Sequence, residues 1–212
     1  RTVAALKESL TKPDTIAGRA FWAATYPGHP YGVSTTPESV AAIQRDDLVN
    51  HHRRHFAATR ATVSIVGDVT RAQAEALAQH LTENLPAGGE TGAVTAPSLP
   101  TGGEKRIAHP SAQTHLLLGL PALKRGDPDF FALQVGNYTL GGGGFVSRLM
   151  KEVREKRGYA YSVYSYFMPL AQPGPFRIGL QTKKEQADEA LALTRQVLAE
   201  FLRDGPSEAE IK

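Results

Sequence analysis

The sequence predicts an α+β fold built from two related modules, in which helices cover antiparallel sheets. Several segments carry apolar residues at every third or fourth position, which is the helical period. Others alternate apolar and polar residues, and residues 159–167 and 176–182 are placed to pair as a hairpin. Helices bracket these hairpin-connected strands instead of alternating with single strands. This order favours separate helical and sheet layers over a doubly wound sheet.

The first module opens with helices, predicted from periodicity and capping residues. Asp14 is placed to cap the second helix, and Thr36 caps the third with Pro37 at its first position. Residues 26–32 contain two prolines and two glycines, so they are predicted to form turns. The predicted helices span residues 2–11, 14–24, 37–44 and 47–56.

A strand and a further helix complete the first module, which we place at residues 1–87. Residues 61–67 read ATVSIVG, a β-branched alternating run that predicts a strand. Thr70 and Gln73 form a capping box that begins the helix, and Pro86 ends it. Residues 88–105 are rich in Gly, Pro, Thr and Ala and poor in large apolar groups, which indicates a linker.

The second module is placed at residues 106–212. Gly158 is positioned to end a helix in the left-handed conformation. Ser207 and Glu210 form a further capping box close to the end of the sequence. We therefore expect a fragment in which the first module is truncated at its start and the second module at its end. The predicted strand, two helices, two hairpin strands and long helix span residues 114–119, 129–140, 145–157, 159–167, 176–182 and 185–203.

Composition argues against several classes of function. The 212 residues hold 24 basic and 21 acidic side chains, a net charge of only +3, and no basic run interleaved with aromatics marks a nucleic-acid face. Without cysteine the chain can form neither disulfides nor thiolate metal sites. No stretch approaches the roughly 18 apolar residues of a membrane span. We therefore expect neither a nucleic-acid partner nor a membrane span.

Two patterns suggest sites but lack essential residues. His51 and His55 stand four positions apart, as zinc ligands on one helix face would, but helical zinc-peptidase motifs also need a glutamate between them. His52 and Arg54 stand where that glutamate would be, and a guanidinium cannot accept a proton from water and would repel the metal. Glycines 141–144 lack the Lys-Ser/Thr of a phosphate-binding loop. A flexible hinge or close backbone packing is the favoured interpretation of this glycine tract.

Residues 140–163 read LGGGGFVSRLMKEVREKRGYAYSV and resemble the pitrilysin/insulinase family of inverted zincins. The resemblance extends over nearly the whole chain. HPYG at residues 29–32 and SIVGDV at residues 64–69 are similar to the close of the family's first α/β domain, and residues from 114 onward to the opening of its second. Active members bind zinc through a His-x-x-Glu-His helix and a later Glu, and nothing in this sequence matches that helix. The resemblance therefore implies the non-catalytic half or subunit of a zinc peptidase.

The resemblance also implies two site residues, Arg154 and Tyr161, which match the family's Arg/Tyr pair. In the family this pair faces the zinc site across a closed chamber. Tyr161 would donate its phenol to the scissile carbonyl or oxyanion, and Arg154 would hold the substrate backbone. No metal ligand or cofactor is expected in this chain; zinc is expected in a homologous partner half or subunit, and unfolded peptides are the expected substrates. Glu8, in the region of the family's third ligand, is interpreted as a surface carboxylate.

Alternatives stay open at this point. Arg154 could pair with Glu152 or Glu155 on a helix surface, and Tyr161 could simply pack its ring. A degenerate family member with a purely structural or peptide-binding role is the main alternative, and a nucleotide site at the glycine tract is a distant one. The chain is expected to be inactive alone. Its Ala, Arg and Gly content indicates a bacterial source, and the family's paired enzymes favour the periplasm or cell envelope over the cytoplasm.

Overall fold

The computed structural model describes residues 2–88 and 91–211 and has the predicted α+β class. Residues 89 and 90, inside the predicted linker 88–105, lie outside the described residues, as do Arg1 and Lys212. The chain forms two compact units, one from residues 1–35 together with 94–212 and the other from residues 36–93. Residues 2–35 thus form one compact unit with the second half of the chain.

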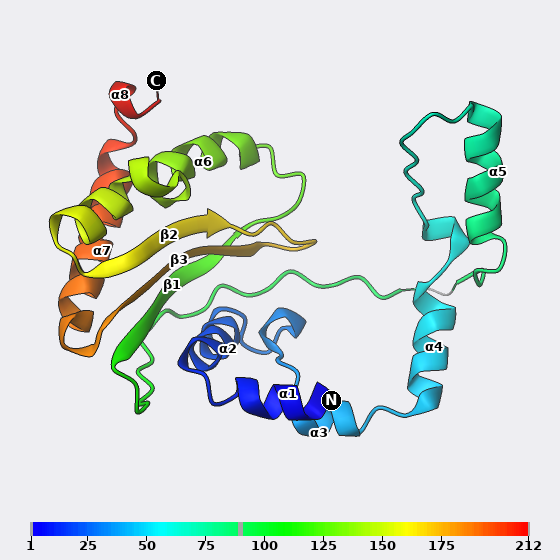
Figure 1. The fold of residues 1–212 in the computed structure, drawn as a ribbon, viewed down its shortest axis with the longest axis horizontal. Coiled ribbons are helices and arrows are strands. Elements are labelled where there is room, and N and C mark those ends of the chain that lie inside the picture. Colours follow the sequence, from blue (N-terminus) through cyan, green and yellow to red (C-terminus); the bar gives the residue numbers. More distant parts are fainter. Residues whose placement is uncertain (1, 89–90, 212) are drawn as a thin grey trace. The chain divides into compact units, whose positions relative to one another are not determined.

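The larger unit is built on a three-stranded antiparallel sheet in the order β1-β3-β2 (Figure 1). Strand β1 (Gln113–Leu123) and strand β2 (Ala160–Phe167) both pair with the central strand β3 (Gly174–Lys183). All three strands were predicted from sequence, β1 over the shorter range 114–119, and β2 and β3 form the predicted hairpin. Strand β2 is therefore an edge strand.

Helices cover one face of this sheet and enclose the hydrophobic core. Helix α6 (Phe130–Asn137) continues into a π-helical turn, η3 (Tyr138–Gly142), and after the 3₁₀ turn η4 (Gly144–Val146) a second π-helix, η5 (Met150–Lys156), follows. The 3₁₀ turn η6 (Lys184–Gln186) leads into α7 (Ala187–Asp204), which completes the layer. The buried core residues are Leu140, Leu149, Met150, Val153, Ala160, Val163, Phe176, Ile178, Leu180, Ala190 and Val197.

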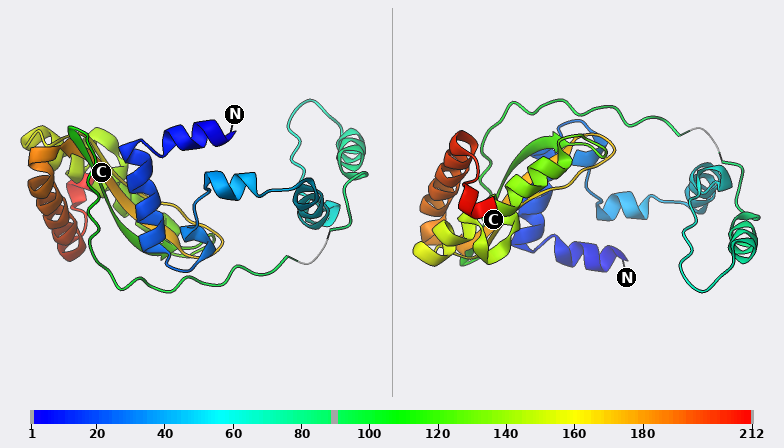
Figure 2. Two further views of the ribbon diagram at one scale, coloured as in Figure 1. Left: turned by 90° about the horizontal axis from the view of Figure 1, so that it is seen from below. Right: turned by 90° about the horizontal axis from the view of Figure 1, so that it is seen from above.

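The opposite face of the sheet carries helix α2 (Pro13–Thr25), which packs on β1 (Figures 1 and 2). Gly119 leaves room there for the Phe21 ring, whose Cζ would lie 2.9 Å from an added Cβ. The predicted cap at Asp14 is wrong, because Pro13 already occupies the first helical position and Asp14 falls within the first turn. Helix α1 (Thr2–Ser9) precedes α2, and the 3₁₀ turn η1 (Pro30–Gly32) lies in the predicted turn region.

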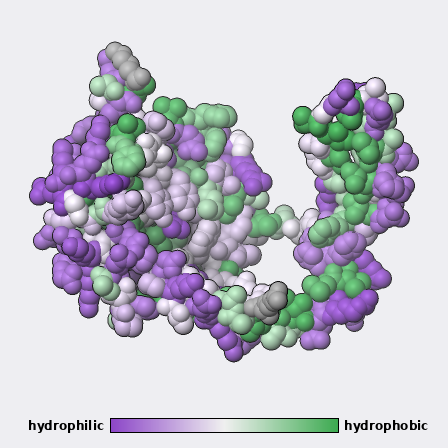
Figure 3. Space-filling model, in the orientation of Figure 1, coloured by the Kyte–Doolittle hydropathy of each residue, from purple (hydrophilic) through white to green (hydrophobic). Residues whose placement is uncertain are grey.

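The smaller unit contains helices α3 (Pro37–Ala41), α4 (Arg45–His55) and α5 (Arg71–Thr82) and the 3₁₀ turn η2 (Ala58–Arg60). Thr36 and Thr70 both form the predicted capping interactions. Apolar side chains, Leu77 and Leu81 among them, lie exposed on α5 (Figure 3). Residues 61–67 do not form the predicted strand. A strand needs hydrogen-bonding partners, and the described residues of this unit contain no other strand.

None of the described helices is long and apolar enough to cross a lipid bilayer.

The glycine tract forms a close contact between the helical layer and β2. A Cβ at Gly141 would lie 2.7 Å from the backbone nitrogen of Ser165 and 2.8 Å from Leu149 Cδ1, and it would also overlap Ser165 Oγ. Asn137 fastens the same contact, because its Nδ2 donates to the Ser165 carbonyl at 3.0 Å and its Oδ1 accepts from the Ser165 hydroxyl at 2.6 Å. Close backbone packing, rather than a free hinge, therefore explains this tract.

The C-terminal segment is tied to the helical layer by an ion pair. Arg148 Nε and Nη2 donate to Glu210 at 2.6 and 2.7 Å, and Nη2 also donates to the Gly205 carbonyl at 2.7 Å. Glu210 belongs to helix α8 (Glu208–Ile211), which begins at the predicted capping box with Ser207. The hydrogen bonds from Arg148 lower the pKa of Glu210 from 4.5 to about 2.

We predict that Gly141→Ala destabilises the protein by about 1–3 kcal/mol, because the methyl group overpacks the contact with Ser165 and Leu149. Gly136→Ala is the matched control: at this helical position an added Cβ meets only Phe201 Cζ, at 3.8 Å, so stability should stay equal or rise by up to about 1 kcal/mol. Urea unfolding of both variants measures the difference. Equal stability of the two variants would contradict the packing described for Gly141.

Acid should weaken the Arg148–Glu210 ion pair in a defined pH range. Because the pKa of Glu210 is depressed in the folded state, its contribution is present above pH 4.5 and is lost as the pH falls towards 2. We predict that Glu210→Gln lowers the Tm at pH 7 and makes the decline in Tm between pH 5 and 2 shallower than in the parent protein. Glu155→Gln, at an exposed position without an ion pair to any described residue, is the control and should leave the profile unchanged.

Candidate functional site

Arg154 is positioned by the end of the π-helix η5 and the chain reversal that follows it. Gly158 adopts a φ of 65°, the left-handed conformation predicted from sequence. The Gly158 N–H donates to the Arg154 carbonyl at 2.8 Å, and the Tyr159 N–H donates to the Val153 carbonyl at 2.9 Å. These two bonds satisfy helix-end carbonyls as in a glycine-terminated helix. The chain therefore turns directly from η5 into strand β2.

Tyr161 is positioned by a β-bulge at the start of β2. Ala160 pairs with Thr182 and Val163 with Leu180, so Tyr161 and Ser162 together lie opposite the single residue Gln181. An extra residue in one strand breaks the regular alternation of side chains and can redirect a side chain next to a site. Tyr161 is 84% exposed, whereas its neighbours Ala160 and Val163 are buried.

The structure brings Arg154 and Tyr161 into contact. The guanidinium carbon of Arg154 lies 4.8 Å from the centre of the Tyr161 ring and 4.7 Å from the centre of the Phe145 ring. A guanidinium at such distances over ring faces makes cation–π contacts, worth about 0.5–1 kcal/mol at exposed sites. Arg154 is thus held between one ring from the helical layer and one from β2.

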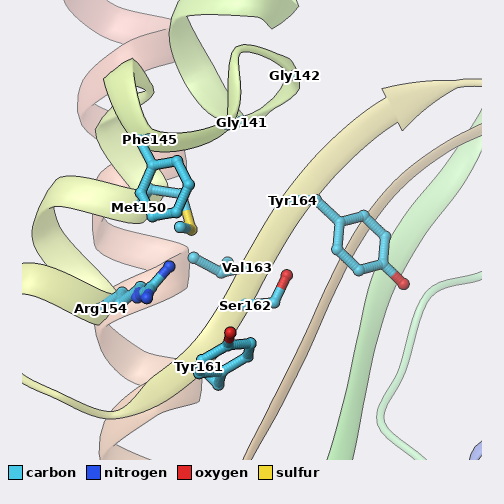
Figure 4. A pocket seen from close by; sticks show the side chains of 10 residues that line it. Gly141, Gly142, Phe145, Met150, Arg154, Tyr161, Ser162, Val163 and Tyr164 are labelled. Carbon is cyan, nitrogen blue, oxygen red and sulfur yellow. The ribbon is translucent and has the colours of Figure 1, made fainter.

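These residues line one hollow with a volume of about 320 Å³ (Figure 4). In Figure 4, Phe145 and Arg154 extend from the helical layer towards β2, which carries Tyr161. The glycine tract forms the adjoining wall, so this wall presents backbone instead of bulky side chains. The lining residues are Gly141, Gly142, Gly144, Phe145, Met150, Arg154 and residues 161–164.

Two neighbouring groups face elsewhere. The Tyr159 hydroxyl donates to Glu189 Oε2 at 2.7 Å, and this hydrogen bond raises the pKa of Tyr159. Glu152 pairs with Lys156 at 2.7 Å, so it is not the partner of Arg154. Tyr159 points towards α7, and Tyr161 is the tyrosine that lines the hollow.

The site is rich in hydrogen-bond donors that the described residues leave available. Among them, neither the Arg154 guanidinium nor the Tyr161 hydroxyl has a side-chain hydrogen bond or an ion pair. A guanidinium carries five N–H donors and a phenol one O–H donor. A ligand that offers carbonyl oxygens, such as an extended peptide backbone, complements this arrangement.

The residues that the structure describes do not fit a zinc ion. No group of three or more His, Asp or Glu side chains suited to a metal occurs within residues 2–88 and 91–211. The His51 and His55 rings lie 4.4 Å apart on α4, and desolvation and the nearby His51 and Arg54 lower the pKa of His55. Glu8 lies exposed on α1, 3.5 Å from Lys12.

Two contacts of the site were not predicted from sequence. Phe145 was assigned only to a helix, although an aromatic directly after a glycine tract was a usable signal. Tyr164 also lines the hollow. Regular strand alternation would place residues 161 and 164 on opposite faces of the sheet, so the sequence did not indicate that both tyrosines reach the hollow across the bulge.

Comparisons with known proteins identify the family. Residues 42–212 match the family described as "Peptidase M16 inactive domain". An uncharacterized zinc protease of Mycobacterium leprae is 35% identical over 211 residues, covering 94% of this chain and 46% of that protein. A relative from Helicobacter pylori named a non-peptidase homolog is 31% identical and covers 83% of this chain and 41% of that protein. The chain spans about half the length of the curated relatives it matches.

Solved structures agree with this assignment. The crystal structure of a peptidase M16 inactive domain from Pseudomonas fluorescens matches 98% of this chain and 51% of that one, at 38% identity and a TM-score of 0.95. A protease from Helicobacter pylori, at 20% identity and a TM-score of 0.78, shares the fold over 98% of this chain and 52% of its own. The chain therefore belongs to peptidase family M16, the pitrilysin/insulinase family, and contains its inactive domain.

Proposed function

We propose that this chain is the non-catalytic, substrate-binding part of a zinc-dependent peptidase. It holds an extended peptide at Arg154 and Tyr161 while a homologous half or subunit that carries the zinc performs hydrolysis in a closed chamber. The observation that supports this proposal is the contact between these two side chains in one hollow, with donors that no described residue occupies.

The chemistry of the pair suits a peptide. The Tyr161 hydroxyl can donate to a carbonyl oxygen, and it becomes a stronger partner as negative charge develops on that oxygen. Arg154 can donate to further backbone carbonyls through its planar fork of N–H groups. Phe145 restricts the guanidinium from its other side, so less rotational freedom is lost when a peptide binds.

The zinc step is assigned to another part of the enzyme, because the described residues do not fit the metal. Relatives named zinc proteases are about twice the length that this chain covers, which leaves room in those proteins for a second half. We assign no proton transfer from water to any residue of this chain.

A second candidate is a family member that binds peptide or supports a partner without contributing to turnover. The relative named a non-peptidase homolog supports it, at 31% identity. The two candidates differ in one respect: only the first requires the Tyr161 hydroxyl for hydrolysis.

We predict that Tyr161→Phe lowers kcat/KM for peptide hydrolysis by the assembled enzyme by roughly 100-fold, as removal of a transition-state donor commonly does. Its ring still contacts Arg154, and the side chain is exposed, so the Tm should change little. Steady-state kinetics with an internally quenched peptide provide the measurement.

Tyr159→Phe is the matched control, because it removes a hydroxyl that bonds Glu189 outside the hollow. This variant should retain kcat/KM within about twofold of the parent. Full activity in Tyr161→Phe would reject the accessory role and favour the second candidate.

A further inference from the structure

Arg177 on the central strand β3 is a second guanidinium held between aromatic rings. Its guanidinium carbon lies 5.6 Å from the Phe21 ring centre and 5.6 Å from the Tyr166 ring centre. Phe21 belongs to α2, so Arg177 lies on the sheet face that α2 packs against, opposite the hydrophobic core. Its strand neighbours Phe176 and Ile178 are buried in that core.

The charge of Arg177 is not balanced by the residues that the structure describes. None of their ion pairs includes Arg177, and its buried Nε has no hydrogen-bond partner. Within residues 2–88 and 91–211, the side chain of Arg177 makes one hydrogen bond, from Nη2 to the Tyr164 hydroxyl at 3.1 Å. The terminal nitrogens of the guanidinium carry further N–H donors besides the one given to Tyr164, so this unbalanced cation is a candidate for binding an external carboxylate.

Tyr164 connects Arg177 to the hollow of Arg154 and Tyr161. It lines that hollow, and in Figure 4 its ring projects away from Arg154 across the neighbouring strand. Gly179 allows this, because a Cβ there would lie 2.6 Å from the Tyr164 Cζ and hydroxyl oxygen. Tyr164 is thus the residue shared by the hollow and by the surroundings of Arg177.

We propose that Arg177 and Tyr164 form a carboxylate-binding subsite for the peptide that Arg154 and Tyr161 hold. The terminal nitrogens of Arg177 would donate to the carboxylate, and Tyr164, which accepts from Arg177, retains its own proton for a second bond. Hydrogen bonds between ionised groups are roughly twice as strong as neutral ones. The carboxylate belongs to an acidic side chain or to the C-terminus of the peptide. This inference rests on the proposed function.

Peptide binding to the full-length protein tests the subsite. Four fluorescein-labelled versions of one unstructured peptide combine Glu or Gln at one position with a free or amidated C-terminus, and fluorescence anisotropy gives each Kd at low salt. We expect a peptide with the matching carboxylate to bind about tenfold more tightly than its neutral counterpart. Dependence on Glu identifies a side chain, and dependence on the free terminus identifies the C-terminal carboxylate. Equal Kd values for all four peptides would overturn the proposal, and this comparison needs no variant.

Variants of the protein test whether Arg177 is the residue that prefers peptides with a carboxylate. Arg177→Met should abolish it, Arg177→Lys should retain part of it because the charge remains, and the exposed-residue control Arg157→Met should retain all of it. A preference that survives Arg177→Met would place the carboxylate elsewhere and overturn the subsite. If the preference is absent while Tyr161→Phe still reduces turnover, the subsite alone fails. If no peptide binds, the proposed function fails with it.

Discussion

The site depends on the absence of a Cβ at Gly141, because this lets the helical layer lie close to the backbone of β2. An added Cβ would lie 2.7 Å from the Ser165 nitrogen, and Asn137 fastens the same place with two hydrogen bonds to Ser165. Leu149 in this layer is fully buried, and Phe145 lines the same hollow as Tyr161. Arg154 then meets a ring from each layer. The position of the Arg154 guanidinium between Phe145 and Tyr161 thus follows from the close backbone packing at Gly141.

The features that local chemistry determines could be predicted from sequence. The alternation of β2 and β3, the left-handed Gly158 and the capping at Thr36 and Thr70 depend on residues within a few positions of one another. Features that depend on distant partners could not be predicted. The run at 61–67 has strand composition, yet a strand also requires a neighbour to accept its hydrogen bonds. The π-helical geometry of η3 and η5 was not predicted either, since the periodicity indicated only helices over 129–140 and 145–157.

For the site, the resemblance supplied Arg154 and Tyr161, but sequence alone could not orient them. A bulge of one residue at Tyr161 and Ser162 leaves no mark in the alternation pattern, yet it decides which side chains reach the hollow. Arg177 carried a usable signal, since a charged residue between Phe176 and Ile178 must face away from the core. Its contact with Tyr164 requires Gly179, whose importance becomes evident only from the strand register.

Photocrosslinking tests most directly whether peptides bind at this hollow. A benzophenone amino acid replaces exposed Ser162, which lines the hollow, or exposed Leu202 on α7 as the control, in the full-length protein incubated with an unstructured peptide. The account predicts that irradiation couples the peptide at position 162 and that excess unlabelled peptide competes it away, with little coupling at position 202. Equal coupling at both positions, or none at 162 while the peptide is bound, would contradict it.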